Sequence, residues 1–94
     1  MRIGKIIWLP DIVEKIDRKH GVQPWEVEQV ISGWVDARKV ARGRVRGEDV
    51  YLVLGQSLAG RYLSIFFILK TDGAALPISA RDMDRKERKL YGRP

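Results

Sequence analysis

Residues 78–91 hold the side chains of this chain that are best suited to chemistry on a charged partner. A short apolar stretch runs into Arg81, and a helix-forming stretch rich in lysine and arginine follows, with Glu87 in its middle. A guanidinium group grips phosphate or carboxylate oxygens through two parallel, charge-assisted hydrogen bonds. The pattern therefore predicts an anion-binding site where a strand ends and a basic helix begins. The rest of the chain has one histidine, His20, no cysteine and no glycine-rich phosphate loop.

The charge of the chain is placed unevenly along it. Residues 1–36 carry five basic and six acidic side chains, a net of −1, and residues 37–94 carry thirteen basic and six acidic ones, a net of +7. A one-sided positive field favours a partner with many negative charges. Nucleic acid fits best, an acidic protein second and a membrane surface third.

Length and composition exclude several classes of protein. Ninety-four residues make one domain, 1–94, with a modest core. The absence of cysteine rules out disulfides and zinc–thiolate sites. We also expect no bound metal and no other cofactor. No apolar segment resembles a signal peptide or a membrane span, and the longest run is only Ile65 to Leu69. We expect a cytoplasmic protein.

Two helices are predicted in the first third of the chain. Residues 2–8 form a first strand by their β-branched character. Apolar residues at helical spacing follow Pro10 and end at Gly21, which suits a helix terminus. Pro24 opens a second helix, which ends near Gly33. The short connection makes these two segments a helical hairpin.

The rest of the chain predicts an antiparallel sheet of three or four strands and a closing helix. The expected strands lie within residues 37–47, 50–54, 61–70 and 75–80. The strand at 61–70 is the longest, and its apolar run indicates a central strand covered on both faces. Asp82 is expected to cap the last helix, on which Asp84 and Arg88 form a pair. The fold class is α+β.

Several segments between Ile6 and Tyr91 occur in an order that resembles a known family. They are Trp8; Lys19-His20-Gly21-Val22; Tyr51 to Gly55; Gly60-Arg61; Ile78-Ser79-Ala80-Arg81; and Arg85-Lys86-Glu87-Arg88 with Tyr91. In this set the chain resembles the BrnT family of type II toxins, small ribonucleases with a RelE/ParE-like fold. Trp8 is followed by Leu9-Pro10, where the family usually has an acidic residue.

This resemblance implies cleavage of RNA without a metal, by attack of a ribose 2′-OH on the adjacent phosphorus. It makes Arg61 and Arg81 the candidates for a clamp on the charged transition state. His20 and Glu87 become the candidates for proton transfer. The remaining residues that would contact RNA are Lys19, Arg85, Lys86, Arg88 and Tyr91.

Each candidate also has a purely structural interpretation. His20 precedes a helix-terminating glycine, where it commonly caps carbonyl groups. Arg61 can pair with Glu48 or Asp49 across a hairpin. Glu87 can belong to a solvated ion pair, and Tyr91 can be a core aromatic.

The resemblance further implies a cognate antitoxin, RNA that includes ribosome-bound mRNA, and promoter DNA contacted only through the antitoxin. Three other functions stay open from the sequence. One is a non-catalytic module that binds nucleic acid, and another is a ParE-like poison of a DNA-handling enzyme. The third is an inactive toxin that serves as a scaffold for its antitoxin.

Overall fold

Three helices and seven strands are present in the computed structural model, which describes residues 1–43 and 45–92. In chain order they are β1 (Arg2–Ile3), β2 (Lys5–Ile6), α1 (Pro10–His20), α2 (Pro24–Ile31), β3 (Gly33–Trp34), β4 (Ala37–Ala41), β5 (Val50–Gln56), β6 (Tyr62–Leu69), β7 (Ala74–Asp82) and α3 (Arg85–Tyr91). The fold is a mixed α+β fold, as predicted. None of the described helices is long and apolar enough to cross a membrane.

The helical hairpin forms for the reasons read from the sequence. Pro10 and Pro24 each occupy the first turn of a helix, where a missing N–H costs no hydrogen bond. Gly21 ends α1 in the left-handed region, with φ of 61°, and its N–H donates to the Asp17 carbonyl. The Glu26 carboxylate accepts from the Gln23 N–H at 3.0 Å and secures the start of α2.

The main sheet has the order β2-β7-β6-β5-β4. Strands β4 to β7 form an antiparallel meander with β6 at the centre, as predicted, and β2 lies parallel to β7. The expectation of a purely antiparallel sheet of three or four strands is thus corrected by this fifth, parallel strand. The predicted first strand is also divided, because β1 leaves the sheet at Gly4 and pairs with β3 instead.

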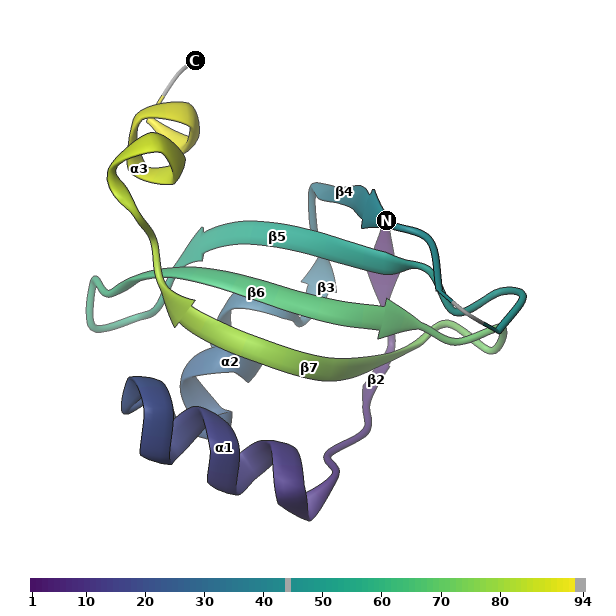
Figure 1. Ribbon diagram of the computed structural model, residues 1–94. Helices are drawn as coiled ribbons and strands as arrows, with labels where there is room; N and C mark the ends of the chain where they lie inside the picture. Colours follow the sequence, from purple (N-terminus) through teal and green to yellow (C-terminus); the bar gives the residue numbers. More distant parts are fainter. Residues whose placement is uncertain (44, 93–94) are drawn as a thin grey trace.

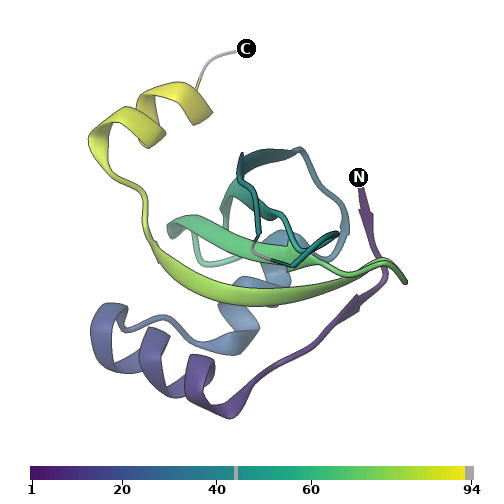
Figure 2. The ribbon, with the colours of Figure 1, turned by 45° about the vertical axis from the view of Figure 1, so that its right-hand side comes forward.

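One face of the main sheet carries the core. Alternate residues of β6, namely Leu63, Ile65 and Phe67, are buried against α1 and α2 together with Ile16 and Ile31. Figures 1 and 2 show both helices below the sheet and α3 above it, at the end where β7 finishes. We call the face on the α3 side the open face. The expectation that β6 is covered on both faces is therefore met along the helix face, and on the open face only at the end near α3, where Ser64 is buried.

Strand β7 and the junction to α3 differ from expectation in detail. With nine residues β7 is longer than β6, which has eight. The cap of α3 is Asp84 rather than Asp82, and its carboxylate accepts from the Glu87 N–H at 2.8 Å. Within the described residues no ion pair joins Asp84 to Arg88, because the carboxylate is used by the helix end. The predicted pair is therefore wrong.

A β-bulge interrupts the pairing of β7 with β6. Phe66 lies opposite Ser79 and Phe67 opposite Pro77, so that Ile78 is the extra residue. The Lys15 ammonium of α1 donates to the Ile78 carbonyl. After the bulge, Arg81 lies opposite Ser64 on the open face.

Candidate active site

Arg81 and Glu87 form the central pair of the candidate site. Nη1 of Arg81 donates to Oε1 of Glu87 at 2.6 Å, and Nη2 donates to Oε2 at 2.9 Å. The guanidinium group also lies over the Phe66 ring, 5.4 Å from its centroid. The side chain of Arg81 is 32% exposed and that of Glu87 is 14% exposed. The strand-end arginine thus faces the junction with α3, as the sequence predicted.

Glu87 holds the arginine and the helix end together. Its Oε1 also accepts from the Asp84 N–H at 2.9 Å, which completes a capping box. Burial raises the pKa of Glu87, but the bonds from Arg81 and from the Asp84 N–H outweigh it, and the pKa lies below its ordinary value. The carboxylate is therefore ionised at neutral pH.

Ser64 lies under this pair and is fully buried. Its hydroxyl makes no hydrogen bond within the described residues, although it is close enough to the Glu87 carboxylate to help lower the pKa of Glu87. A buried hydroxyl without a partner is uncommon. A serine in the apolar run of β6 was the signal that could have marked it.

Arg81 keeps hydrogen-bonding capacity in reserve. Its Nη1 donates to Glu87 and to the Asp82 carbonyl, and Nη2 donates once. A guanidinium has five N–H groups. Among the described residues, its Nε–H and one Nη2–H have no acceptor. These two donors are therefore not used by Glu87 or by the Asp82 carbonyl.

Helix α3 brings further basic residues to the same face. The Arg88 guanidinium lies 3.6 Å from the centroid of the Tyr62 ring, and Tyr91 meets that ring edge-on at 6.0 Å. Arg85 and Lys86 are exposed. A cleft of about 290 Å³ lies between α3 and the sheet, and the residues that line it are Asp36, Arg38, Leu52, Leu54, Leu90 and Tyr91.

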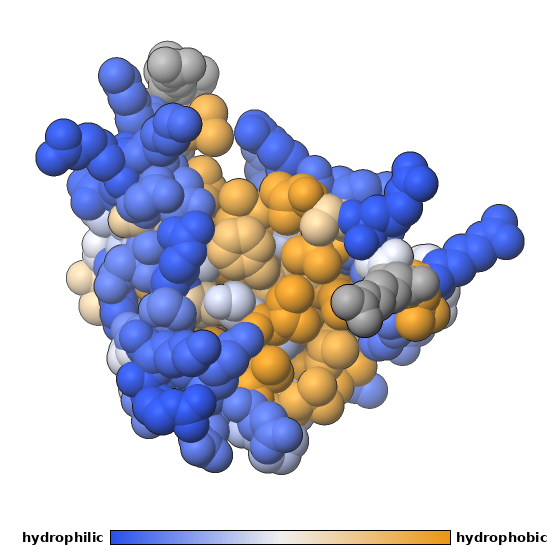
Figure 3. All heavy atoms as spheres, in the orientation of Figure 1, coloured by the Kyte–Doolittle hydropathy of each residue, from blue (hydrophilic) through white to orange (hydrophobic). Residues whose placement is uncertain are grey.

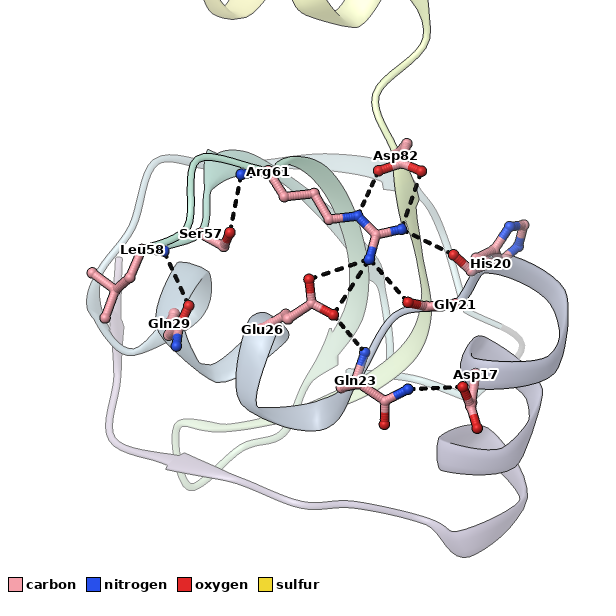
Figure 4. Close-up of polar contacts among 10 residues, drawn as sticks. All are labelled: Asp17, His20, Gly21, Gln23, Glu26, Gln29, Ser57, Leu58, Arg61 and Asp82. Carbon is pink, nitrogen blue, oxygen red and sulfur yellow. Dashed lines mark hydrogen bonds and ion pairs between the residues drawn. The ribbon is translucent and has the colours of Figure 1, made fainter.

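Arg61 occupies a different place. All five of its N–H groups are used, since Nε and Nη2 hold the Asp82 carboxylate at 2.7 and 3.1 Å, and Nη1 holds Glu26 at 3.2 Å. The carbonyls of Gly21 and His20 accept at 2.9 and 3.0 Å (Figure 4). This one side chain joins α1, α2 and the end of β7. It has no donor left for a phosphate, and its partners are not Glu48 or Asp49.

Arg61 and Arg81 lie on opposite faces of the sheet. Successive residues of a strand point to opposite sides, so Asp82, which binds Arg61, faces the helices when Arg81 faces α3. His20 ends α1 on the helix side, and its charge adds to the Arg61 hydrogen bonds that lower the pKa of Asp82. Lys19 precedes it. The structure therefore does not bring Arg61, His20 or Lys19 to the Arg81–Glu87 pair, and a joint clamp of Arg61 and Arg81 is not supported.

The structure does bring together the other predicted residues. Arg81, Glu87, Arg88 and Tyr91 meet at the junction of β7 and α3, with Arg85 and Lys86 on the same helix. Tyr62 belongs to this group but was missed, because its contact with Arg88 depends on where α3 packs. Within residues 1–43 and 45–92, no group of three or more His, Cys, Asp or Glu side chains could hold a metal ion.

Comparison with known proteins finds a similar solved structure. No family model matches the chain. No curated protein matches it either. A solved structure does: the ribonuclease toxin BrnT of Brucella abortus superposes with a TM-score of 0.62, covering 86% of this chain and 97% of that one, at 20% sequence identity. The two chains share one fold.

The match to BrnT confirms the fold expected from the resemblance. It spans most of both chains, so the likeness concerns the fold as a whole rather than one segment. At 20% identity the likeness shows the fold alone, and the function of individual residues has to be argued from the site.

Proposed function

We propose that this protein is the ribonuclease toxin of a toxin–antitoxin pair, and that it cuts mRNA in the cytoplasm without a metal. The observation that carries the proposal is the Arg81–Glu87 pair, which combines an ionised carboxylate with two unused guanidinium donors beside a basic helix. The fold shared with a ribonuclease toxin supports it.

The chemistry assigned to this pair is attack of a ribose 2′-OH on the adjacent phosphorus. Glu87 accepts the 2′-OH proton as general base. The free Nε–H and Nη2–H of Arg81 donate to a non-bridging phosphate oxygen and offset the charge that grows in the transition state. The 2′-oxygen–phosphorus bond forms and the bond to the 5′-oxygen breaks. The 5′-oxygen takes a proton from a water molecule, and the hydroxide that is left takes the proton from Glu87, which restores the carboxylate. The products are a 2′,3′-cyclic phosphate and a 5′-OH.

The other residues bind the flanking RNA in this proposal. Arg85, Lys86 and Arg88 neutralise phosphates, and Tyr91, which lines the cleft, stacks on a base. Arg61 is a positioning residue, since it holds the end of β7 from the helix side. Lys19 and His20 stand next to that structural cluster, and we assign them no step in the reaction.

The test is cleavage of a short RNA in the presence of EDTA. The wild-type protein should release a product with a 2′,3′-cyclic phosphate. Arg81→Ala and Glu87→Gln should each slow cleavage at least about 100-fold, the range expected for loss of a transition-state donor or a general base. Arg18→Ala is the matched control, because Arg18 is an exposed cation on α1 whose ion pair, among residues 1–43 and 45–92, is with Glu14 alone.

Expression in cells tests the toxin itself. Induction without an antitoxin should stop growth and fragment RNA, and Arg81→Ala should abolish both effects while circular dichroism shows the protein folded. Soluble wild-type protein that leaves growth unaffected would contradict the proposal.

A second candidate function is RNA binding without cleavage. It is favoured by the position of His20, the single histidine, on the face away from Glu87. Binding that weakens steeply with salt while the RNA stays intact after long incubation would decide for it.

A further inference from the structure

Strand β6 presents a serine between two aromatic residues at the end of the open face nearest α3. Because side chains alternate along a strand, Tyr62, Ser64 and Phe66 all lie on this face. In Figure 3 hydrophilic side chains gather over α3 and the end of β7, and apolar side chains cover the middle of the sheet. Ser64 is fully buried, so the side chains of the β7–α3 junction must cover it.

An arginine covers the aromatic ring on each side of Ser64. The Arg88 guanidinium lies 3.6 Å from the centroid of the Tyr62 ring. The Arg81 guanidinium lies 5.4 Å from the centroid of the Phe66 ring. The face of an aromatic ring carries partial negative charge, so it attracts a guanidinium and repels a carboxylate. Of these three neighbours on β6, the serine is therefore the one that a carboxylate can approach.

Arg81 holds the Glu87 carboxylate beside Ser64. Arg81 lies opposite Ser64 in the pairing of β7 with β6, and its guanidinium bonds both oxygens of Glu87, at 2.6 and 2.9 Å. Oε1 of Glu87 also accepts from the Asp84 N–H, whereas Oε2 accepts from Arg81 alone among the described residues. A carboxylate oxygen can accept two hydrogen bonds. Oε2 therefore has room for one more donor.

The hydroxyl of Ser64 is unfavourable for packing alone. It makes no hydrogen bond within residues 1–43 and 45–92, and a buried hydroxyl without a partner destabilises a fold. Alanine would fill nearly the same space in β6 without that loss. Burial raises the pKa of Glu87, and the Ser64 hydroxyl joins Arg81 and the Asp84 N–H in lowering it, as expected of a donor close to the ionised group.

We propose that Ser64 is a positioning residue for Glu87, whose hydroxyl donates to Oε2 and keeps the carboxylate in place when Arg81 turns to the phosphate. The inference rests on the proposed function, in which Arg81 binds the phosphate and Glu87 is the general base. As Nη2 of Arg81 moves to a phosphate oxygen, Oε2 loses that hydrogen bond. The Ser64 hydroxyl then holds Oε2, and the acceptor site that Nη2 leaves receives the 2′-OH proton.

Ionisable groups from three elements lie near the Glu87 carboxylate. They are Arg81 from β7, Tyr62 from β6, and Asp84, Arg88 and Tyr91 from α3. Arginine stays charged and tyrosine stays neutral between about pH 3 and 7. Of these groups, Asp84 titrates in the same range as Glu87. The two carboxyl groups therefore have to be followed separately.

The first test follows the Glu87 carboxyl itself. The side-chain carboxyl resonances of Glu87 and Asp84 are recorded against pH by NMR, without RNA, in the wild type and in Ser64→Ala. We expect the Glu87 midpoint to rise by at least about 0.5 pH in Ser64→Ala, because the ionised form loses a donor. Ser57→Ala is the matched control and should leave this midpoint unchanged. Ser57 is also buried, at 5% exposed, but its hydroxyl accepts from the Arg61 N–H at 3.1 Å.

The second test is the pH profile of RNA cleavage. Ser64→Ala should lower kcat about tenfold and leave KM within about twofold, because Ser64 is buried and does not touch RNA. The acidic limb of its profile should move to higher pH together with the NMR midpoint. Ser64→Thr keeps the hydroxyl and should restore the wild-type limb. If the added methyl group prevents folding of Ser64→Thr, the comparison of Ser64→Ala with the wild type still decides.

Two results would overturn the inference. One is an unchanged Glu87 midpoint in Ser64→Ala, which would show that the serine only fills space. The other is an equal rise of the midpoint in Ser57→Ala.

The two proposals can fail separately. If the wild type cleaves no RNA but the Glu87 midpoint rises in Ser64→Ala, the result counts against the nuclease alone. If Ser64→Ala cleaves RNA at the wild-type rate and with the wild-type acidic limb, the result counts against the role of Ser64 alone.

Discussion

Arg81 and Glu87 meet through two hydrogen bonds across the junction of β7 and α3, at 2.6 and 2.9 Å. The same carboxylate also caps the helix through the Asp84 N–H. The pair therefore has a structural role and a proposed chemical role. Substitution and the pH dependence of stability can distinguish these two roles.

Glu87→Gln is predicted to destabilise the protein at pH 7 by about 1.5–3 kcal/mol, the usual contribution of a hydrogen bond to a charged group. Glutamine still serves in a capping box, so the change removes mainly the charge. Because the folded-state pKa of Glu87 lies below the ordinary 4.5, its contribution is present above pH 4.5 and is lost as pH falls through the folded pKa. Urea unfolding should show the difference between variant and wild type shrinking from pH 7 to pH 3. A difference that is the same at both would contradict the assignment.

Arg61→Lys is predicted to cost about 2–4 kcal/mol of unfolding free energy. Lysine keeps the charge but cannot reach the acceptors that Arg61 joins on three elements, and it leaves Glu26, 17% exposed, without its cation. Urea denaturation measures the loss. Arg18→Ala, which removes an exposed pair on α1, should cost less than about 0.5 kcal/mol. Similar losses in the two variants would show that Arg61 is an ordinary surface residue.

Tyr62→Leu is predicted to loosen α3 without loosening the core. The Arg88 contact with the ring is worth about 1 kcal/mol, so the amides of residues 85–91 should exchange roughly fivefold faster. Tyr51→Leu is the matched control, because Tyr51 stacks on Phe67 at 5.9 Å on the helix face. Hydrogen exchange followed by NMR measures the amides of α3 separately from those of the core helices α1 and α2. Unchanged exchange in α3 would mean that other contacts hold it.

Lys86→Ala is predicted to reduce the salt dependence of RNA binding. Loss of one phosphate contact to a single strand should lower the slope of log K against log salt by about 0.7. The measurement uses a fully 2′-O-methylated oligonucleotide, which lacks the nucleophile and stays intact. Arg18→Ala should leave the slope unchanged. If the slope falls equally in Lys86→Ala and Arg18→Ala, RNA does not bind preferentially at α3, and the prediction is wrong.

Local sequence signals predicted the helices and most strands. Proline at two helix starts and Gly21 at a helix end act on the nearest turn, so these helix ends can be predicted without knowing the tertiary structure. The parallel pairing of β2 with β7 joins residues about 70 positions apart, and no local pattern carries that information. Asp82 and Asp84 both suit a helix start. Asp84 caps α3, because the Asp82 carboxylate is bound by Arg61.

The candidate site was predicted in part for the same reason. Arg81 and Glu87 lie within seven residues of each other, and the strand-to-helix junction that unites them was visible in the sequence. Arg61 was predicted to act with Arg81 and Glu87 because of the family resemblance. Its true partners, Glu26 and Asp82, come from α2 and the far end of β7, and only the packed structure brings them together.

The bulge at Ile78 has a consequence for where charge lies. Side chains in β7 alternate as though Ile78 were absent, so Arg81 points to one side of the sheet and Asp82 to the other. If the bulge lay beyond Asp82 instead, Arg81 would take the place opposite Leu63 that Asp82 now holds, and its guanidinium would lie beside that of Arg61 in place of the carboxylate that Arg61 binds. Lys15 grips the Ile78 carbonyl from α1. A lysine of the first helix thus fixes the direction in which the last strand presents its arginine.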